Sequence, residues 1–592
     1  MNDRLATAAV MPNPGVPTRV NALIFAAKAN LLRARRAVRD LLPGLAPTRH
    51  PHATGLVDAP VIASIRTPLW TSAGGEKDRA LNAGKIQNLR CALRGLDGIE
   101  VEAGRTLSFW RQVGRPVRRR GFVAGRELRE GCMIATIGGG LCQLSNALYD
   151  AGLQAGLEIV ERHGHTRIVP GSRAAAGRDA TVFWNYLDLR MRGSHRFRIE
   201  ARLTASDLEL AIRGDSAKPR MPTSDSFAGL AAHDCLSCGQ TRCHKHDPDI
   251  EAARAPTAWL MGEPSAEFSM YYRDRAAPDH VLHLTSRHIG KGGRTWPRVG
   301  SEKSAELATL RRSLSLRLAR SGTPRAALMM DADARLARAY ARRVSPSCTH
   351  LVVAQALLPH LWRLGVLQGR RFDVLIDRLP LDALHRILDD AWSRHPESPT
   401  LGDYRAPQSI VAAEREALAA AARLVTAHRA AAACFPAGRV ELRDWAPAPP
   451  LAARHGGRTI LFAGPALARK GAHAMRDAMR GLDMQLLIER GAVEQDHFWD
   501  GFDVRYRLAD DPPATLAGIV LPALVEHRPG TVLRALAAGL PVIATRACGV
   551  PPQPGLTLVA PHDSDALRAA LIAMLAADTN EPQALEDAAA VR

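Results

Sequence analysis

The feature that most limits the fold of this 592-residue chain is the regular alternation of short apolar strands and alanine-rich helices after about residue 255. The apolar runs are HLVVAQALL, FDVLIDRL, RTILFAG, MQLLIE and AGIVLPALV. Strands that alternate with helices along a chain form parallel sheets covered by helices. The stretch DWAPAPPLAARHGG interrupts the alternation, so we predict two such Rossmann-like lobes, at residues 255–452 and 453–592.

Residues 56–215 carry a second pattern, in which helical and strand-like stretches follow one another. GKIQNLRCALRGL and LCQLSNALYDAGLQAG have apolar residues at helical spacing, whereas LEIVERHGHTRIV and TVFWNYLDLRMRG read as strands. A chain of this length is too long for one core. We therefore predict an α+β domain here, preceded by a basic segment at residues 1–55 and joined to the lobes by a linker at residues 216–254. The overall fold class is α/β.

Composition and net charge limit the cellular compartments and the classes of binding partner that we expect for this protein. No run of about 18 apolar residues predicts a membrane span, and the first residues lack the features of a secretion signal. We therefore expect a cytoplasmic protein whose nine cysteines are thiols or metal ligands rather than disulfides. The net charge of +20 favours anionic partners, but dispersed arginines without interleaved aromatic residues argue against nucleic acid. The sequence predicts no oligomeric state.

One basic stretch stands out near the N-terminus. Residues 21–42 place apolar side chains at helical spacing, and the basic residues between them are Lys28, Arg33, Arg35, Arg36 and Arg39. A basic amphipathic helix of this kind lies on an anionic membrane surface. The same pattern also fits a helix that docks on its own domain and leaves its charged face in solvent. The sequence leaves both interpretations open.

A glycine-rich turn leads into a helix at Cys142, within TIGGGLCQLSNALYDAGL. A thiol in the first turn of a helix lies at the positive end of the helix dipole, which favours the nucleophilic thiolate. The next strand supplies His163 and His165, two residues apart and so expected on one face, and Asp179 follows. A nucleophilic cysteine needs a base and an orienting group, so these four residues form a candidate catalytic set. The alternative is a buried structural cysteine.

The segment HDCLSCGQTRCHKH contains the densest cluster of metal-binding side chains. Cys235, Cys238 and Cys243 supply thiolates at metal-ligand spacing, and His244 or His246 would complete a tetrahedral site. We expect structural zinc, with an iron–sulfur centre as the second choice. A solvated linker with incidental thiols is the other interpretation.

Two strand-to-helix turns in the last lobe have the composition of a ligand site. In LFAGPALARKGAHAMRDAM, Lys470 and Gly471 stand at a helix start, which suits a phosphate. In LPALVEHRPGTVLRALAAGLPVIAT, Glu526 follows a buried strand. Ligands of open α/β sheets bind at the carboxyl ends of the strands, so both turns are candidate ligand-binding positions.

The first half of the chain resembles a known family. The run from GRTLSFWRQVG through GGGLCQLSNALYDAGLQAGLEIVERHGHT to GRDATVFWNYLDLRMRG is similar to the VanW family, named for an accessory protein of vancomycin-resistance clusters. The resemblance is dense over residues 64–193 and implies a connection with the cell envelope and cell wall. The biochemical activity of that family is not established, so the resemblance places the domain and leaves its chemistry open.

Residues 459–575 resemble the donor-binding lobe of group-one retaining glycosyltransferases of the GT-B fold, and residues 255–450 would be the acceptor lobe. The resemblance implies a nucleotide sugar as donor substrate. It implies that Glu526, the first Glu of a Glu-x7-Glu motif, contacts the donor sugar. The residues expected near the donor phosphates are Gly464, Arg469, Lys470 and Gly471.

Two positions depart from that pattern. Arg534 occupies the place of the second Glu, and a guanidinium has no acceptor with which to hold ribose hydroxyls. Pro465 occupies the place of a phosphate-binding arginine. Three interpretations follow: transfer from a donor held differently, with Arg534 facing a phosphate; binding of a glycan or nucleotide without turnover; or a scaffold for the VanW-like half.

We therefore expect an envelope-associated, cytoplasmic glycosyltransferase with a degenerate donor motif, acting on a glycan or lipid-linked precursor. The competing class is a non-catalytic binding or assembly protein for such precursors, with a Cys-dependent hydrolase or transferase activity in the VanW-like domain.

Overall fold

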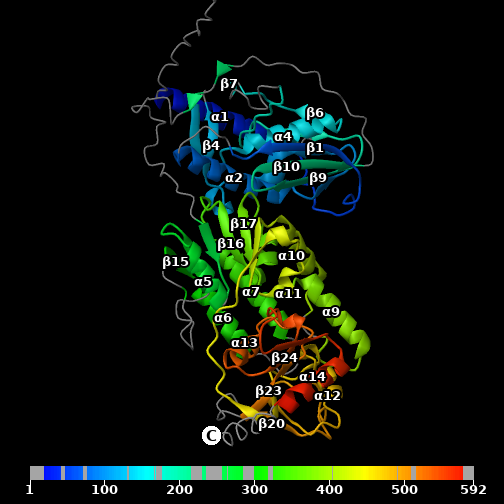
Figure 1. Ribbon diagram of the computed structural model, residues 1–592. Helices are drawn as coiled ribbons and strands as arrows, with labels where there is room; N and C mark the ends of the chain where they lie inside the picture. Colours follow the sequence, from blue (N-terminus) through cyan, green and yellow to red (C-terminus); the bar gives the residue numbers. More distant parts are fainter. Residues whose placement is uncertain are drawn as a thin grey trace, which may run out of the picture. The chain divides into compact units, whose positions relative to one another are not determined.

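The computed structural model describes residues 19–41, 47–70, 76–129, 132–165, 167–168, 177–214, 230–231, 233–234, 257–262, 265–284, 296, 299–317, 325–402, 405–489, 491–507 and 515–577. The chain forms two compact units. The first comprises the chain up to residue 256 with residues 345–349 and 368–370, and the second comprises the rest. Figure 1 shows the elements of both units, coloured along the sequence.

The first unit is an α+β domain with largely antiparallel sheets. Its main sheet contains, in order, β1 (Val61–Pro68), β10 (Asp207–Gly214), β9 (Phe197–Leu203) and β2 (Ile99–Val101). A second sheet contains β3 (Thr106–Ser108), β8 (Arg190–Arg192) and β6 (Glu158–Glu161). The shorter ladders join β12 (His233–Asp234), β5 (Cys132–Ile137) and β4 (Ala124–Arg129), and β11 (Leu230–Ala231) with β7 (Arg167–Ile168).

Two helices close the core of this domain. α2 (Glu76–Leu96) packs on β4 and β9, and α4 (Leu141–Gln154) packs on β1 and β10. Both helices were predicted from their apolar spacing, and both bury that stripe, with Leu89, Leu144 and Leu148 fully inside. The other helices among the described residues of this unit are α1 (Arg19–Arg39), α3 (Phe109–Val113) and a 3-10 turn at Arg118–Arg120.

Two of the predicted strands are wrong in extent. In LEIVERHGHTRIV the strand β6 ends at Glu161, so His163 and His165 do not share the face of a strand. The carbonyl of His163 instead accepts a hydrogen bond of 2.7 Å from the amide of Thr181, and the amide of His165 donates to the Asp179 carboxylate. This backbone therefore pairs with an irregular segment rather than continuing a ladder.

TVFWNYLDLRMRG is also not a continuous strand, because only its end forms β8. The carbonyl of Phe183 accepts hydrogen bonds from the amides of Tyr186 and Leu187, at 3.0 and 3.1 Å, which closes a turn. The buried Asp188 then accepts a 2.6 Å hydrogen bond from the hydroxyl of Ser108. A turn and a buried carboxylate thus interrupt the period-two pattern.

The second unit begins with a seven-stranded parallel sheet. The strands, in order, are β15 (Ser301–Ser304), β14 (Val281–Leu284), β13 (Thr257–Leu260), β16 (His350–Ala354), β17 (Arg371–Leu375), β18 (Arg423–Thr426) and β19 (Val440–Leu442). The connecting helices are α5 (Ala266–Arg275), α6 (Glu306–Arg317), α7 (Arg325–Ala341), α8 (Leu358–Arg363), α9 (Leu381–Arg394), α10 (Gln408–Ala420) and α11 (Arg429–Ala432).

A six-stranded parallel sheet forms the second lobe of this unit. Its order is β22 (Val504–Arg507), β21 (Gln485–Glu489), β20 (Arg454–Phe462), β23 (Thr515–Leu521), β24 (Val542–Thr545) and β25 (Leu556–Val559). Its helices are α12 (Ala472–Ala478), α13 (Gly530–Ala537) and α14 (Ser564–Ala577). The two predicted Rossmann-like lobes and their strands are confirmed, and the fold class is α/β.

Both sheets have a point where the strand order reverses. In the first lobe the reversal lies between β13 and β16, and in the second it lies between β20 and β23. In doubly wound folds the ligand binds outside the carboxyl ends of the strands at this point. The topology therefore directs attention to the turns that follow β20 and β23.

Candidate functional sites

The turns after β20 and β23 meet at the switch point of the second lobe. Lys470 follows β20 and Glu526 follows β23, and Nζ of Lys470 lies 2.6 Å from Oε2 of Glu526. Oε1 of Glu526 accepts a 2.9 Å hydrogen bond from the amide of Arg528. Both predicted residues thus occupy one partly buried ion pair at the carboxyl edge of the sheet.

The backbone holds these two turns together. The carbonyl of Arg469 accepts hydrogen bonds from the amides of Leu524 and Val525, at 3.0 and 3.2 Å. Gly471 has φ 86°, and a Cβ there would lie 2.0 Å from the carbonyl oxygen of Pro522. Gly464 also has positive φ, at 127°. Glycine at 471 is therefore required both by conformation and by the close approach of the neighbouring turn.

A histidine from the first lobe completes this contact. His428 follows β18, and its Nε2 donates a 2.6 Å hydrogen bond to the backbone carbonyl of Glu526. Its Nδ1 accepts from the amide of Ala431 at 3.2 Å, which fixes the tautomer. Burial lowers the pKa of His428, so the ring is neutral at pH 7. No sequence motif indicates this residue, which lies almost one hundred positions before Glu526.

His527 lies among cations beside the same ion pair. Burial, followed by the positive charges of Arg378, Lys470 and Arg469, lowers the pKa of His527 far below its ordinary value. Its Nε2 is buried and has no hydrogen-bond partner among the described residues. A neutral ring nitrogen surrounded by cationic side chains is suited to donate a hydrogen bond to an anion.

Arg378 is held in place by the first lobe. Its Nη2 donates a 2.8 Å hydrogen bond to the buried Oε1 of Glu414, and its amide donates to Oε1 of Gln355 at 3.2 Å. The neighbouring Asp377 has a buried Oδ1 without a hydrogen-bond partner in the described part of the chain. Both residues follow β17, at the carboxyl end of the first sheet.

Arg534 is placed apart from this pair. It is exposed on α13, and none of the described hydrogen bonds or ion pairs joins its guanidinium to Lys470 or Glu526. The structure thus brings together Arg469, Lys470, Gly471 and Glu526 of the predicted donor site, and leaves Arg534 facing solvent.

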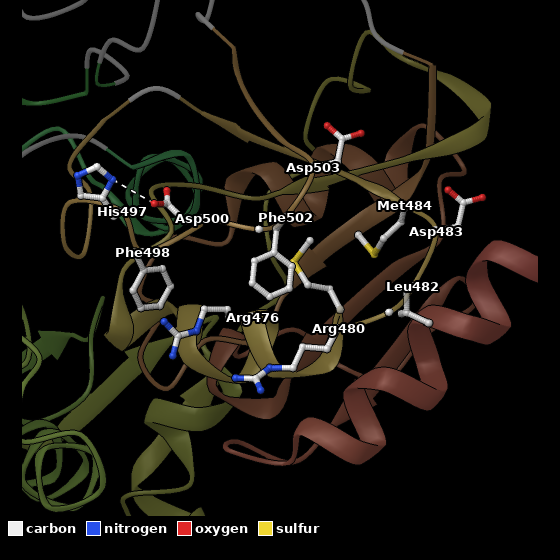
Figure 2. A pocket seen from close by; sticks show the side chains of 13 residues that line it. Arg476, Arg480, Leu482, Asp483, Met484, His497, Phe498, Asp500, Phe502 and Asp503 are labelled. Carbon is white, nitrogen blue, oxygen red and sulfur yellow. Dashed lines mark ion pairs between the residues drawn. The ribbon is translucent and has the colours of Figure 1, made fainter.

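A hollow of about 770 Å³ lies elsewhere in the second lobe (Figure 2). Its lining includes Arg476, Arg480, His497, Phe498 and Phe502, and it contains none of the predicted donor residues. The lining segments directly precede β21 and β22. The hollow is therefore at the amino ends of the strands, opposite the edge where ligands of such sheets bind.

The predicted cysteine set of the first unit is assembled in part. Cys142 lies in the first turn of α4, and its Sγ is 3.7 Å from Oγ1 of Thr181. Oγ1 of Thr181 is 2.7 Å from Nε2 of His165, and Nδ1 of His165 is 2.5 Å from Oδ1 of Asp179. Cys142, His165 and Asp179 are therefore linked by successive contacts. The first of these contacts runs through the hydroxyl of Thr181, which was not predicted from the sequence.

His163 does not join this set. Its Nε2 lies 3.1 Å from Oε1 of Glu161, and its side chain is 40% exposed. The placement of His163 and His165 on one face was wrong, because the strand ends before both residues.

Electrostatics favour a charged His165. Burial lowers its pKa, but the hydrogen bonds and negative charges of Asp179 and Cys142 outweigh burial and raise the pKa of His165 to about 10. The ring is therefore an imidazolium at neutral pH. A cationic imidazole beside a sulfur stabilises the thiolate form of cysteine.

The glycines before Cys142 have a structural reason. Gly140 has φ 95°, and a Cβ there would lie 2.1 Å from Cγ of Lys85. A Cβ at Gly139 would lie 2.2 Å from the carbonyl oxygen of Gly125. These positions need glycine because the start of α4 lies against Lys85 and Gly125 of the same domain.

The helix α1 docks on the first unit through its polar side. Arg36 forms a buried ion pair with Glu161, and Nε of Arg33 donates a 2.8 Å hydrogen bond to the carbonyl of Trp184. Phe25 packs edge-on against Phe183, with ring centroids 6.0 Å apart. The apolar side chains that stay exposed are Val20, Leu23, Ile24, Leu31, Leu32 and Val38. No helix in the described part of the chain is long and apolar enough to cross a membrane.

The predicted zinc ligands Cys235, Cys238, Cys243, His244 and His246 lie outside the described residues, so that site stays a prediction. Within the described residues, His395, Glu397 and His473 place ligand atoms within 4.8 Å of one another. The two imidazoles stack at 3.9 Å with an angle of 12° between their planes. Since imidazole ligands approach an ion along their ring planes, parallel stacked rings do not converge on one metal, and this contact is packing.

Comparison with known proteins agrees with this division. Residues 84–213 match the family "VanW like protein", and residues 508–577 match "Glycosyl transferases group 1". The protein YoaR of Bacillus subtilis is 35% identical over 114 residues, which are 19% of this chain and 37% of YoaR. The vancomycin B-type resistance protein VanW of Enterococcus faecalis is 33% identical over 118 residues, 19% of this chain and 43% of VanW. The chain thus spans less than half the length of these curated relatives.

Solved structures similar to the chain include a sucrose-phosphate synthase and a galactosyltransferase. Sucrose-phosphate synthase from Thermosynechococcus elongatus is 15% identical, with a TM-score of 0.37, and the match covers 55% of this chain and 90% of that one. The lipopolysaccharide outer core galactosyltransferase WaaB is 12% identical, with a TM-score of 0.34, over 54% of this chain and 90% of its own. By its family match, the C-terminal part of the chain is similar to group 1 glycosyltransferases, and its two lobes are Rossmann-like parallel sheets. More specifically, this part follows a VanW-like domain in the same chain.

Proposed function

We propose that the second unit transfers a sugar from a nucleotide-sugar donor to an envelope glycan or lipid-linked precursor. The observation that carries the proposal is the Lys470–Glu526 pair at the switch point between β20 and β23. Ligands of doubly wound sheets bind at such points. The family match to group-one glycosyltransferases includes Glu526 and supports the choice of donor class.

In this proposal the cationic side chains near His527, which are Arg378, Arg469 and Lys470, bind the diphosphate of the donor. As the bond between the sugar and the diphosphate breaks, negative charge grows on the leaving phosphate oxygens. Glu526 holds Lys470 and Glu414 holds Arg378 before that charge develops, so these cations stabilise the transition state more than the ground state. The unpartnered Nε2 of His527 supplies a further hydrogen-bond donor to a phosphate oxygen when it carries the ring proton.

Glu526 is assigned to the transferred sugar. Its ionised carboxylate has acceptor capacity beyond the two hydrogen bonds from Lys470 and Arg528, and sugar hydroxyls are donors. Lys470 neutralises the carboxylate so that it can stand next to an anionic diphosphate. The pair therefore orients the sugar and the leaving group together.

Binding without turnover is the second candidate, and two residues favour it. Arg534 lies exposed where the family has a ribose-binding Glu, and Pro465 follows Gly464 where the family has a phosphate-binding arginine. Incubation of the protein with a panel of nucleotide sugars separates the two candidates. A transferase releases nucleoside diphosphate at a measurable rate, whereas a binding protein raises its own melting temperature and releases none. If the protein neither releases nucleoside diphosphate nor gains melting temperature, both candidate functions are contradicted.

We further propose that α1 contacts an anionic membrane surface. Its exposed apolar side chains Val20, Ile24, Leu31 and Val38 are spaced by four or seven residues, which are about one and two helical turns, so they form one stripe. The exposed cations Lys28, Arg35 and Arg39 border the stripe and complement anionic headgroups. A contact of this kind would bring the transferase to lipid-linked acceptors. We propose a cytoplasmic location, since the free thiol of Cys142 suits a reducing compartment.

A further inference from the structure

A second reactive centre stands in the first unit, independent of the sugar site. The thiol of Cys142, the hydroxyl of Thr181 and the imidazole of His165 form a chain with steps of 3.7 Å and 2.7 Å. Thr181 is fixed because its amide donates a 2.7 Å hydrogen bond to the carbonyl of His163. Its hydroxyl is thereby held between the sulfur and Nε2 of His165.

Asp179 orients the imidazole from the other side. Its Oδ1 accepts from Nδ1 of His165 at 2.5 Å, and its Oδ2 accepts from the backbone amide of the same residue. Nε of Arg162 donates a 2.6 Å hydrogen bond to the carbonyl of Asp179 and holds the segment. Two bonds to one carboxylate fix both the ring plane and the protonated Nδ1, so Nε2 is directed toward Thr181 and the sulfur.

The other described cysteines show how a structural thiol differs. Cys91, Cys348 and Cys548 are buried in the cores, and burial raises the pKa of Cys91 and raises that of Cys548 to about 12. Cys142 is only partly buried, and the hydroxyl of Thr181 links its sulfur to the His165–Asp179 pair. Its surroundings are those of a nucleophile rather than of a packing residue.

We propose that the VanW-like domain is a cysteine-dependent acyl hydrolase or acyltransferase, with Cys142 as nucleophile, His165 as general acid and base, and Asp179 as a positioning residue. The substrate class is an amide or ester. The geometry of the thiol, imidazole and carboxylate carries this assignment, and it does not depend on the sugar site.

The reaction balances without a redox partner. The thiolate of Cys142 attacks the acyl carbon, a sulfur–carbon bond forms, and the bond to the leaving nitrogen or oxygen breaks as His165 gives that atom its proton. Water or an amine then attacks the thioester and gives a proton back to His165, and the acyl–sulfur bond breaks to restore the thiolate. Thr181 serves as a positioning residue that links the sulfur to the ring.

The test uses the full chain and p-nitrophenyl acetate as acyl probe. We expect release of about one equivalent of p-nitrophenol in a burst and a mass increase of one acetyl group, which peptide mapping assigns to Cys142. His165→Gln should slow acylation by about 100-fold or more, as the loss of a general acid–base does. Cys434→Ser, at an exposed cysteine, is the matched control and should leave the burst unchanged.

A merely structural role is excluded by two further measurements. Thr181→Val should slow acylation and Thr181→Ser should restore it, while circular dichroism and melting temperature stay as in the parent protein. Alkylation by iodoacetamide should be faster at Cys142 than at the exposed Cys434, because the imidazole of His165, whose pKa is raised to about 10, is charged near the sulfur. Acylation of Cys142 no faster than that of Cys434, or unchanged in His165→Gln, would overturn the proposal. Lys470→Ala should leave acylation intact, which keeps this outcome separate from the sugar site.

Discussion

Nζ of Lys470 lies 2.6 Å from Oε2 of Glu526, and the two residues come from turns that follow neighbouring parallel strands of one sheet. Each charge is only partly exposed, at 14% for the lysine side chain and 10% for the glutamate side chain. Removing one partner therefore leaves the other poorly solvated and uncompensated. The pair is a single unit, and its two members have to be tested separately.

Lys470→Ala should weaken binding of nucleoside diphosphate by about 10- to 100-fold, the cost of one charge-assisted hydrogen bond. Isothermal titration calorimetry with the diphosphates of uridine, guanosine, adenosine and thymidine measures this. Arg480→Ala is the control, since Arg480 is an exposed cation of the same lobe in the hollow of Figure 2. If Arg480→Ala removed binding and Lys470→Ala did not, the ligand would belong in that hollow.

Arg534→Glu should raise the affinity for nucleosides and nucleotides by about 10-fold if the site retains the shape of the family's donor site. The reason is that a carboxylate accepts hydrogen bonds from ribose hydroxyls, whereas a guanidinium only donates. Arg534→Gln, which has an amide oxygen acceptor and no charge, should give a smaller gain. A loss of affinity in Arg534→Glu would instead show that Arg534 binds a phosphate of the ligand.

Leu31→Asp combined with Val38→Asp should reduce binding to phosphatidylglycerol-containing vesicles by at least 10-fold, because both substitutions place charge in the exposed stripe of α1. Sedimentation with vesicles measures the bound fraction, and binding of the parent protein should weaken as salt rises. Leu307→Asp is the control, since Leu307 is a strongly exposed leucine on α6. Self-association of the parent protein through the stripe, lost in the double variant, would contradict membrane binding.

Acid should destabilise the first lobe of the second unit through His283. Burial, with the positive charges of Lys303 and Arg343, lowers the pKa of His283 to about 4, against about 6.5 in the unfolded chain. Folding favours the neutral ring, so this stability is fully present above about pH 6.5 and is lost as the pH falls through about 4. Between pH 7 and 4.5 the loss is about 2 kcal/mol.

Urea unfolding of His283→Phe at the two pH values checks this expectation. The phenyl ring keeps the aromatic contact with Tyr340 and does not titrate, so the variant should lose less stability on acidification than the parent. His497→Phe, at a highly exposed histidine, should behave as the parent does. An equal acid loss in His283→Phe and the parent would contradict the assignment.

The parallel sheets were predictable because their strands are buried on both faces and so read as apolar runs, as in VIAT of β24. Lys470 and Glu526 were predictable for a related reason, since each lies in the turn between such a strand and the next helix. Cys142 was found from the glycines before it. In each case the information lies within a few residues along the chain.

The remaining site residues depend on tertiary structure. Nothing near His428 indicates that its ring bonds to the carbonyl of Glu526, because the two residues come from different lobes. In the sequence, Arg378 is an ordinary residue after a strand. Only the structure shows that Glu414 and Gln355 hold it in place. The error at His163 arose because strand periodicity cannot show where backbone pairing stops, and here it stops when the chain bonds to Thr181 and Asp179.

Glu161 connects two features that are distant in sequence. Burial alone would raise its pKa, but the hydrogen bond and charge of Arg36 outweigh burial and hold the pKa of Glu161 below its usual value. Detaching α1 would leave this carboxylate, with only 14% of its side chain exposed, without its principal counterion. A bilayer that binds the outer side of α1 would therefore contact a helix that is firmly attached to the first unit, not a flexible linker. The first unit, with Cys142 in it, would then be held in one orientation on that surface.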